Sequence, residues 1–345
     1  MSFKKSTSYL LGLLLLGTVL FGAYKINKVA FAANVPNSIP DEFICIPSNA
    51  TYDQIVQQLV AKGYIENEAS FRTVAEWMHF EQPNMRAGRY KIEKEWGNYT
   101  LINKLKTGKQ SPVKVVLHDA RLVEDIASRV GKLIEPDSVA LMTAFSDSAL
   151  LAKFGLNKEN FMSIFIPNTY EVFWNITPEK FMERMKKERD NFWEKDDRLN
   201  KAKAMGLTPE QVYTFASIVE KETLKNDEKP RIAGLYLNRY HIDMPLQADP
   251  TAVFATRDFD ATRVLDYHLQ YDSPYNTYKY KGLPPGPIYM ASISSIDAVL
   301  EAEKHNYIFM CAKPDESGYH AFAETMQGHR VNANAYRDWL DKRGY

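Results

Sequence analysis

Two glutamates two residues apart, Glu220 and Glu222, are the residues of this sequence best suited to acid–base chemistry. They lie within FASIVEKETLKND, residues 215–227, where an apolar run precedes them and a single lysine separates them. A carboxyl group held against apolar side chains keeps its proton to higher pH than one in water, which is what a general acid working near neutral pH requires. The surroundings of each carboxyl therefore decide which one can act.

Helical spacing sends the two glutamates to different faces. We expect a helix over 209–224, and at about 100° per residue Glu222 falls near the centre of its apolar face while Glu220 points almost the opposite way. That apolar face is formed by Val212, Phe215, Ile218 and Val219. The pattern favours Glu222 as the acid, with Glu220 as the alternative and as a helper or surface residue. It leaves open that Glu222 only pairs with Lys225 or Arg231 at the edge of the core.

The elements around this helix are of mixed type. Thr208 can cap the helix, and Pro209 is favoured at its first position. A strand from Pro112 comes before it, followed by an aromatic-rich loop, FIPNTYEVFWNITP, among helices expected over 122–133, 136–145, 148–154 and 178–196. A helix over 294–303 and the strand NYIFMCAK follow it. This mixture predicts an α+β fold for the larger domain, residues 111–345.

Residues 41–110 form a smaller unit in the sequence pattern. A strand near Phe43 leads into a helix that Asn49 or Thr51 can cap and that ends at Gly63. A helix over 67–80, the strand AGRYKI and the helix TLINKLKTGK follow. The unit contains no convergent acid, base and nucleophile, so we interpret it as a binding or spacer module.

The N-terminal region has the pattern of a membrane anchor. Residues 6–24, which number 19, carry no charge, and a helix of that length reaches about 28 Å, close to the thickness of a bilayer core. We expect a cytoplasmic tail over 1–7, an anchor over 8–26 and a polar linker over 27–40, with the bulk of the chain outside the cytoplasm. The small residues Ala30 and Ala32 leave a cleaved signal peptide as the alternative.

Composition restricts the remaining function classes. Lys and Arg together number 43, as do Asp and Glu, so the formal net charge is zero and gives no sign of a nucleic-acid binder. Cys45 and Cys311 lie far apart without the spacing of a metal site, and His320 and His329 are too isolated for one. We expect no metal and no cofactor.

Several separated motifs make the chain resemble the endolytic murein transglycosylase (YceG-like) family of bacteria. They are ASIVEKET, LNRYHIDMPLQADPT and YNTYKYKGLPPGPI, with the weaker segments IPNTYE and HAF, all in family order after a single N-terminal span. The resemblance implies a LysM-like small unit and a catalytic unit with a lysozyme-like helical core. It also implies a protein of the bacterial inner membrane that cleaves peptidoglycan strands and ends their elongation, with cell-wall synthases as partners.

The resemblance also assigns the acid. The second glutamate of the E-K-E-T segment is Glu222, and it would protonate the oxygen of a β-1,4 bond between N-acetylmuramic acid and N-acetylglucosamine, after which the muramic 6-hydroxyl closes a 1,6-anhydro ring. Polar side chains suited to sugar hydroxyls and acetamido groups are Gln247, Asp249, Asn276, Thr277, Tyr278 and Glu171. Rings that could stack on sugars are Tyr170, Trp174 and Tyr275, although a place in the core is the alternative for each.

Two other functions stay open. A muramidase-type hydrolase would need a second carboxylate, Glu171 or Asp249, to activate water. A glycan-binding scaffold that recruits synthases would need no acid, and Glu222 would then be structural.

Overall fold

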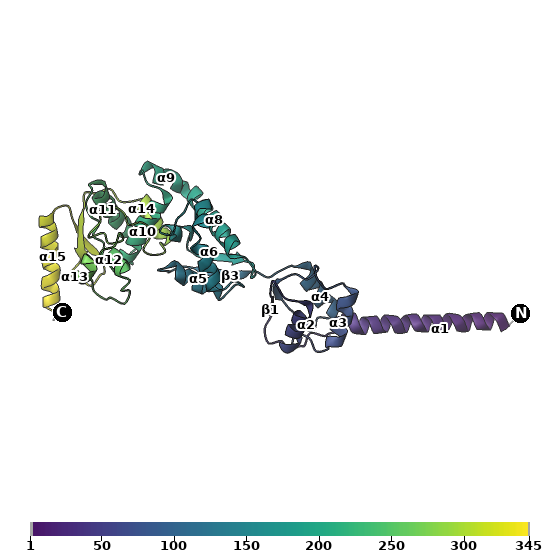
Figure 1. Ribbon diagram of the computed structural model, residues 1–345. Coiled ribbons are helices and arrows are strands. Elements are labelled where there is room, and N and C mark those ends of the chain that lie inside the picture. Colours follow the sequence, from purple (N-terminus) through teal and green to yellow (C-terminus); the bar gives the residue numbers. More distant parts are fainter. Residues whose placement is uncertain (1–2, 344–345) are drawn as a thin grey trace. The chain divides into compact units, whose positions relative to one another are not determined.

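The structure, a computed structural model, describes residues 3–343, with side chains described from Leu10 onward, and divides into two compact units (Figure 1). The first unit comprises Met1–Val113, Leu133–Glu135 and Glu171–Ile176, and the second comprises Lys114–Lys132, Pro136–Tyr170 and Thr177–Tyr345. Each unit has its own hydrophobic core and is described separately below.

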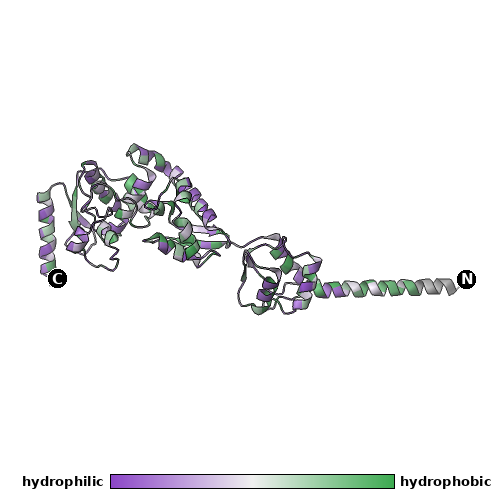
Figure 2. Cartoon of the chain, in the orientation of Figure 1, coloured by the Kyte–Doolittle hydropathy of each residue, from purple (hydrophilic) through white to green (hydrophobic). Residues whose placement is uncertain are grey.

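The chain begins with an exposed apolar helix, α1 (Phe3–Ile26), followed by a turn of π-helix, η1 (Asn27–Phe31). Within residues 3–343, the 22-residue segment Leu10–Phe31 is the one helical segment long and apolar enough to cross a membrane. Figure 2 shows its hydrophobic colouring, and Leu15 is 67% exposed. A helix this long with apolar side chains on all sides fits the interior of a bilayer better than water.

The first unit packs three helices against a small sheet. Strand β1 (Phe43–Ile46) pairs antiparallel with β2 (Gly88–Lys91), and the helices are α2 (Tyr52–Ala61), α3 (Glu68–Trp77) and α4 (Asn98–Thr107). Thr51 caps α2 by accepting a hydrogen bond from the backbone N–H of Gln54, and Gly108 ends α4 with φ of 69°. The expected order of strand, helix, helix, strand and helix is confirmed.

Residues 27–40 pack against this unit through Ala30, Asn34 and Val35, so the expectation that the whole segment is a linker is wrong. Ala30 and Val35 are only 4% and 1% exposed. The side chain of Asn34 donates a hydrogen bond to Asn98 Oδ1 over 2.6 Å, and the N–H of Val35 donates to the carbonyl of Trp96 over 2.9 Å. Polar composition indicated a linker, but these polar groups find buried partners.

The second unit is mostly helical. Its helices are α5 (Val123–Gly131), α6 (Ser138–Phe145), α7 (Ser148–Lys153), η2 (Phe161–Ile164), α8 (Pro178–Glu194), η3 (Lys195–Asp197), α9 (Arg198–Ala204), α10 (Pro209–Glu222), α11 (Lys229–His241), α12 (Asp249–Thr256), α13 (Asp266–Gln270), α14 (Ile293–Leu300) and α15 (Met326–Asp341). Strands β3 (Val113–Leu117) and β4 (Asn168–Val172) form one two-stranded sheet, and β5 (Phe309–Ala312) and β6 (His320–Ala323) form another. The α+β prediction is confirmed. The segment expected to be an aromatic-rich loop instead contributes β4.

Helix α10 lies in the middle of this unit, in contact with α11, α12 and α14 (Figure 1). Thr208 caps it and Pro209 opens it, as expected, but it ends at Glu222. Every residue from Val212 to Val219 is buried, so both faces of α10 lie in the core. Neighbouring helices thus cover the face that carries Tyr213, Ala216 and Ser217 as well as the apolar face.

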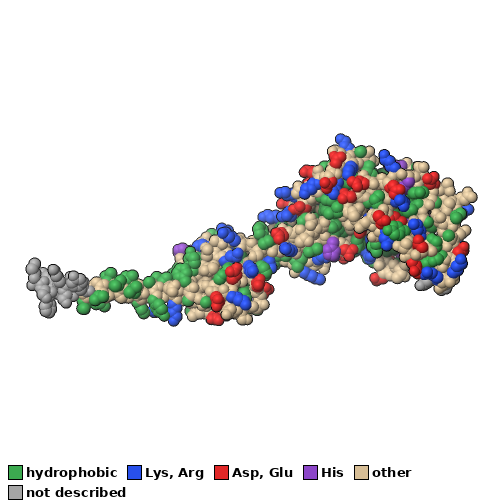
Figure 3. Space-filling view, turned by 180° about the vertical axis from the view of Figure 1, so that it is seen from behind, with side chains coloured by type: hydrophobic (Ala, Val, Ile, Leu, Met, Phe, Trp, Pro, Cys, Tyr) green, Lys and Arg blue, Asp and Glu red, His purple; other side chains and the backbone are tan. Residues whose placement is uncertain are grey.

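Charged side chains of both signs are interspersed over the face of the second unit shown in Figure 3. This distribution fits the equal numbers of acidic and basic residues in the chain.

Candidate active site

Glu222, the last residue of α10, has its carboxyl group at the wall of a cavity. Tyr236 Oη donates a hydrogen bond to Glu222 Oε1 over 2.5 Å. Burial raises the pKa of Glu222 to about 7; the bond from Tyr236 and the charges of His320 and Arg239 oppose that rise, and the Asp249 carboxylate adds to it. A carboxyl with this pKa is about half protonated at neutral pH, as a general acid and base should be.

Glu222 and Asp249 line two cavities, which we call cavity A and cavity B. Cavity A has a volume of about 220 Å³ and is also lined by Leu235, Tyr236, Arg239, Leu246, Gln247, Tyr278, Met310, Cys311, Ala312 and His320. Cavity B has a volume of about 330 Å³ and is also lined by Arg121, Lys221, Pro250, Val253, Phe254, Phe259, Ala261, Ile288 and Tyr289. The two carboxyl groups shared by both cavities are thus placed to meet a ligand that extends from one cavity into the other.

Three of the residues expected to bind substrate lie in cavity A with Glu222: Gln247, Asp249 and Tyr278. Asp249 is the first residue of α12 and accepts a hydrogen bond from Tyr278 Oη. Gln247 has a left-handed backbone, with φ of 50°, and its N–H donates to the carbonyl of Thr277 over 3.1 Å. The LQADPT and YNTYKY motifs therefore meet beside Glu222.

Asn276 and Thr277 have structural roles, which corrects the expectation that they contact substrate. Asn276 is 0% exposed, and its Nδ2 donates hydrogen bonds to the carbonyls of His268, Leu269 and Tyr271. Thr277 is 1% exposed, and its Oγ1 accepts from the N–H of Ala248 over 3.1 Å. Both side chains hold the segment that presents Tyr278, and neither lines cavity A or B.

The aromatic loop residues lie elsewhere. Tyr170 is 5% exposed and donates a hydrogen bond to the carbonyl of Ile166 over 2.6 Å, so it belongs to the core. Glu171 is exposed and belongs to the first unit, and like Trp174 it lines neither cavity. Tyr275 packs against Phe254 of cavity B, with ring centres 4.9 Å apart.

Glu220 lies in a different environment, a polar cluster between α10, α11 and α14. Its Oε2 accepts hydrogen bonds from Ser295 Oγ over 2.5 Å and from Ser292 Oγ, and it pairs with Lys229 Nζ over 3.1 Å. Burial acts to raise the pKa of Glu220, but the bonds from Ser292, Ser295 and Lys229 outweigh it and lower that pKa. The expectation for Glu220 was a helper or a surface residue, and the surface alternative is wrong, because these partners enclose a carboxylate whose side chain is only 21% exposed.

Two site residues on α11, Tyr236 and Arg239, were missed from the sequence. Tyr236 is 2% exposed, and Arg239 is 7% exposed with its guanidinium donating to the carbonyls of Leu246 and Ile308, each over 2.6 Å. A spacing of three places both side chains on one face of α11. The signal was present in LYLNRY, which overlaps the start of the motif that carries Gln247, so that Arg239 lies inside that motif and Tyr236 directly before it. The partner Glu222 is not visible from this spacing.

A histidine also faces cavity A. His320 Nδ1 lies 2.9 Å from Glu228 Oε2, and the N–H of His320 donates to Glu228 Oε1 over 2.7 Å. Glu228 is 3% exposed and also accepts from Thr223 Oγ1 over 3.3 Å. The buried carboxylate thus orients the imidazole at the cavity wall, and the HAF motif is the sequence signal for it.

Within residues 3–343, no three His, Cys, Asp or Glu side chains gather in a way that could hold a metal ion. The site is organised around the carboxyl group of Glu222, whose pKa burial raises to about 7, a value suited to general acid–base chemistry.

Comparison with known protein families identifies the class of protein to which this chain belongs. The model of the YceG-like family matches residues 44–335. That match includes both cavities and most of the chain, and the protein belongs to the YceG-like family.

Relatives in other bacteria cover most of this chain. The endolytic murein transglycosylase of Bacillus subtilis is 27% identical over 334 residues, which cover 92% of this chain and 91% of that protein. The endolytic murein transglycosylase of Streptococcus pneumoniae D39 is 25% identical over 323 residues, 83% of this chain and 57% of the longer pneumococcal protein. A crystal structure of a YceG-like protein from Listeria monocytogenes superposes with a TM-score of 0.56 at 25% identity, covering 84% of this chain and 98% of that one.

Proposed function

We propose that this protein is an endolytic peptidoglycan lytic transglycosylase. It cleaves the β-1,4 bond between N-acetylmuramic acid and N-acetylglucosamine in nascent strands, leaves a 1,6-anhydromuramic end and so terminates strand elongation. Membership of the YceG-like family and the names of the bacterial relatives support this class of reaction. The observation that carries it is the single carboxyl of Glu222, with a pKa of about 7, at the wall shared by two cavities.

In the first step, protonated Glu222 donates its proton to the glycosidic oxygen. The bond from the muramic anomeric carbon to that oxygen breaks, and the N-acetylglucosamine side leaves with a hydroxyl group. Glu222 becomes a carboxylate, stabilised by the hydrogen bond from Tyr236. The exposed Asp249 carboxylate, which lines both cavities, provides negative charge near the positive character that develops at the anomeric carbon.

In the second step, the Glu222 carboxylate takes the proton of the muramic 6-hydroxyl as that oxygen attacks the anomeric carbon. The new bond closes the anhydro ring, and Glu222 regains its proton, so no water is consumed and no second base is needed. Because the nucleophile belongs to the substrate, its proximity replaces an enzymic nucleophile. A pKa near 7 suits both steps, since the same group must give and take a proton.

The product tests this proposal. Digestion of uncrosslinked glycan by the full chain, followed by mass spectrometry, should give anhydromuramic ends, each 18 mass units lighter than a reducing end. Reducing ends would support a muramidase instead. Asp249 is the candidate base for that rival, because it lines both cavities with Glu222; Glu171 lines neither.

The Glu222→Gln variant distinguishes the proposed enzyme from a non-catalytic glycan-binding scaffold. Under our proposal, the variant loses turnover and still binds glycan, because the amide keeps the size of the side chain without an acidic proton. Unchanged turnover in this variant would remove Glu222 from the mechanism.

We also propose that α1 anchors the protein in the bacterial inner membrane, with a cytoplasmic tail over 1–7, the anchor over 8–26 and both units on the periplasmic side. The apolar span Leu10–Phe31 supports an anchor. The burial of Ala30 in the core of the first unit argues against cleavage after Ala32, because that cut would remove a core residue.

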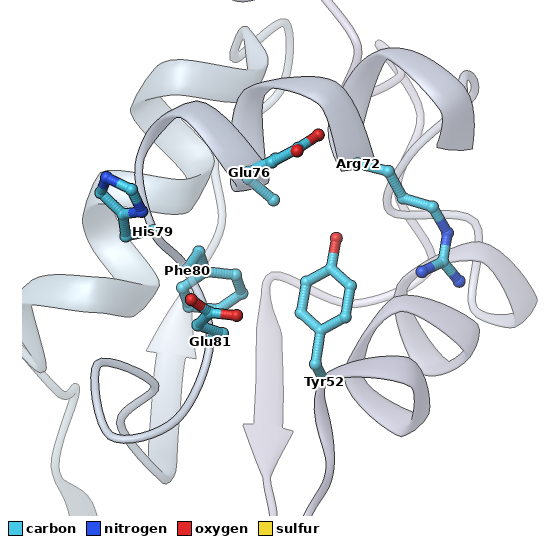
Figure 4. Close-up of a pocket in the computed structure, with 7 residues that line it drawn as sticks. Tyr52, Arg72, Glu76, His79, Phe80 and Glu81 are labelled. Carbon is cyan, nitrogen blue, oxygen red and sulfur yellow. The ribbon is translucent and has the colours of Figure 1, made fainter.

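The domain assignment remains part of this proposal. We assign residues 41–110 to a LysM-like domain and 111–345 to the catalytic domain with a lysozyme-like helical core around α10. The first unit contains a cavity of about 520 Å³ between α2 and α3. Figure 4 shows the rings of Tyr52 and Phe80 in this cavity with the charged side chains of Arg72, Glu76 and Glu81 around them. This surface is where we place glycan or synthase contacts of the first unit.

A further inference from the structure

Cavity B contains two positive charges that the mechanism above does not use. Lys221 Nζ lies 4.5 Å from the centre of the Tyr289 ring, and the Arg121 guanidinium lies 4.3 Å from the centre of the Phe259 ring. Within residues 3–343 neither side chain forms an ion pair with Asp or Glu, and the side chain of Arg121 makes one long hydrogen bond, of 3.5 Å, to the carbonyl of Phe259. Each cation is thus held by an aromatic face and keeps donors free for a ligand.

The acidic groups near these cations are already engaged. Asp249 accepts the hydroxyl of Tyr278, and Asp119 accepts the hydroxyl of Tyr289. Glu222 retains much of its proton at neutral pH, because burial raises its pKa to about 7. The carboxylates of Asp249 and Asp119 keep their negative charge, but among the described residues they form no ion pair with Lys221 or Arg121, so the donors of both cations stay open to an anion that enters cavity B.

The remaining wall of cavity B is apolar. It consists of Pro250, Val253, Phe254, Phe259, Ala261 and Ile288. Cavity A differs, since Gln247, Tyr278, Arg239 and His320 give it polar groups. A ligand part that combines an anion with small apolar groups fits cavity B, and a neutral sugar rich in hydroxyl and acetamido groups fits cavity A.

We infer that cavity B binds the substituent at C3 of the muramic acid residue, with its carboxylate at Lys221 and Arg121 and its methyl group against Val253 and Ile288. This inference rests on the proposed function, because that function places a muramic residue beside Glu222. The muramic residue differs from N-acetylglucosamine in a lactyl ether that carries one methyl group and one carboxylate. In peptide-bearing strands an amide replaces that carboxylate, and the attached peptide supplies the next methyl groups and carboxylates.

The assignment gives the cleft a direction. The muramic residue that becomes the anhydro end lies on the side of cavity B, and the departing N-acetylglucosamine lies on the side of cavity A. Glu222, which lines both, is then beside the bond between them.

Binding to an inactive full chain tests the inference without turnover. The Glu222→Gln protein in detergent is titrated calorimetrically with three soluble, uncrosslinked strands of equal length: peptide-free with lactyl carboxylates, the same strand with these carboxylates methyl-esterified, and a peptide-bearing strand. We expect the esterified strand to bind about 5- to 20-fold more weakly than its acid form, in line with the loss of charge-assisted hydrogen bonds. The peptide-bearing strand should bind more tightly than the ester, because the carboxylates of its peptide take the place of the lactyl carboxylate at the cations; binding as weak as that of the ester would contradict the assignment of this substituent to cavity B.

Substitutions of the two cations test whether Lys221 and Arg121 cause the difference in affinity between the acid and ester strands. Lys221→Gln and Arg121→Gln, each added to Glu222→Gln, should weaken the acid strand by about 5-fold or more and leave the ester unchanged. Lys225→Gln is the matched control: Lys225 lies four residues further on, its Nζ is 5.2 Å from the centre of the Tyr319 ring, and it lines neither cavity. It should change neither affinity.

Equal affinity for acid and ester, or equal losses for both strands in the variants, would overturn the inference. Arg121 and Lys221 lie in separate segments, so one variant carries the test if the other fails to fold. Failure of the proposed function has a different signature, because the active protein would then yield no anhydromuramic ends from any strand.

Discussion

Glu220 and Glu222 have the same side chain, lie two residues apart on one helix, and have opposite electrostatic environments. Glu220 meets a cation and serine hydroxyls, whose hydrogen bonds lower its pKa, whereas Glu222 meets a tyrosine hydroxyl and a cavity wall, where burial raises its pKa to about 7. The nearest cation to Glu220 is Lys229, at 3.1 Å. The difference shows that partners from other helices, rather than exposure along α10, assign the role of each carboxyl.

The sharpest test of this comparison replaces each glutamate by glutamine. Glu222→Gln should lower kcat/KM by about 10²- to 10⁴-fold, the usual contribution of a general acid, without loss of stability. Glu220→Gln should lower the free energy of unfolding by about 3 kcal/mol, because it leaves the Lys229 ammonium buried without a counter-ion. Glycan digestion and denaturant unfolding measure the two effects.

The control is the double variant Glu220→Gln with Lys229→Met, which removes the uncompensated charge and should recover part of the lost stability. If Glu220→Gln abolished turnover at full stability, the roles assigned to the two glutamates would have to be exchanged.

The second prediction concerns pH. Activity requires protonated Glu222, so kcat/KM should fall as pH rises through about 7, its pKa in the folded protein. A raised pKa in the folded state gives stability that is present below the unfolded value, 4.5, and is lost as pH rises through about 7. Glu220, whose pKa is lowered, gives stability that is present above 4.5 and is lost in acid. Urea unfolding measured across pH 3–9 would show both pH dependences of the free energy of unfolding.

Glu222→Gln serves as the reference for this profile. It should gain stability relative to the unsubstituted protein, by roughly 3 kcal/mol, as the pH rises from 4.5 to 8. If the difference in free energy of unfolding between the two proteins stayed constant across that pH range, Glu222 would titrate in the folded protein as it does in water.

The smallest expected effects come from the neighbours of Glu222. Tyr236 donates to the carboxylate and lowers its pKa, whereas the charge of Asp249 raises it. Tyr236→Phe should therefore shift the alkaline limb of the kcat/KM profile to higher pH, and Asp249→Asn should shift it to lower pH. If both variants shifted the alkaline limb in the same direction, or if neither shifted it, the result would contradict the environment assigned to Glu222.

Two residues outside the cavities provide controls for these shifts. Tyr240, also on α11, packs on Phe215 with ring centres 5.4 Å apart, and Asp243 pairs with Lys281 at the surface. Neither lines cavity A or B. Tyr240→Phe and Asp243→Asn should leave the profile where it is.

Local signals predicted much of the fold. The caps Thr51 and Thr208 and the terminating Gly108 act within a few residues of chain, so they could be recognised before the structure. Residues 27–40 could not be placed in the same way, because their polarity indicated a linker while their partners, such as Asn98, lie far along the chain.

The candidate site was predictable in part. Motifs brought Gln247, Asp249 and Tyr278 into consideration, and the structure gathers them beside Glu222. The same motifs also included Asn276, whose amide serves backbone carbonyls instead. A polar side chain in a motif can support the loop or face the ligand, and sequence spacing does not separate these two uses.

The sequence by itself determined the apolar N-terminal segment, the helix that carries both glutamates, and the motifs of the YceG-like family. Only the tertiary structure decided which carboxyl keeps a proton near neutral pH. The reason is physical: a pKa depends on burial and on charges and donors within a few ångströms. Those around Glu222 come from α11, α12 and β6, as Tyr236, Asp249 and His320.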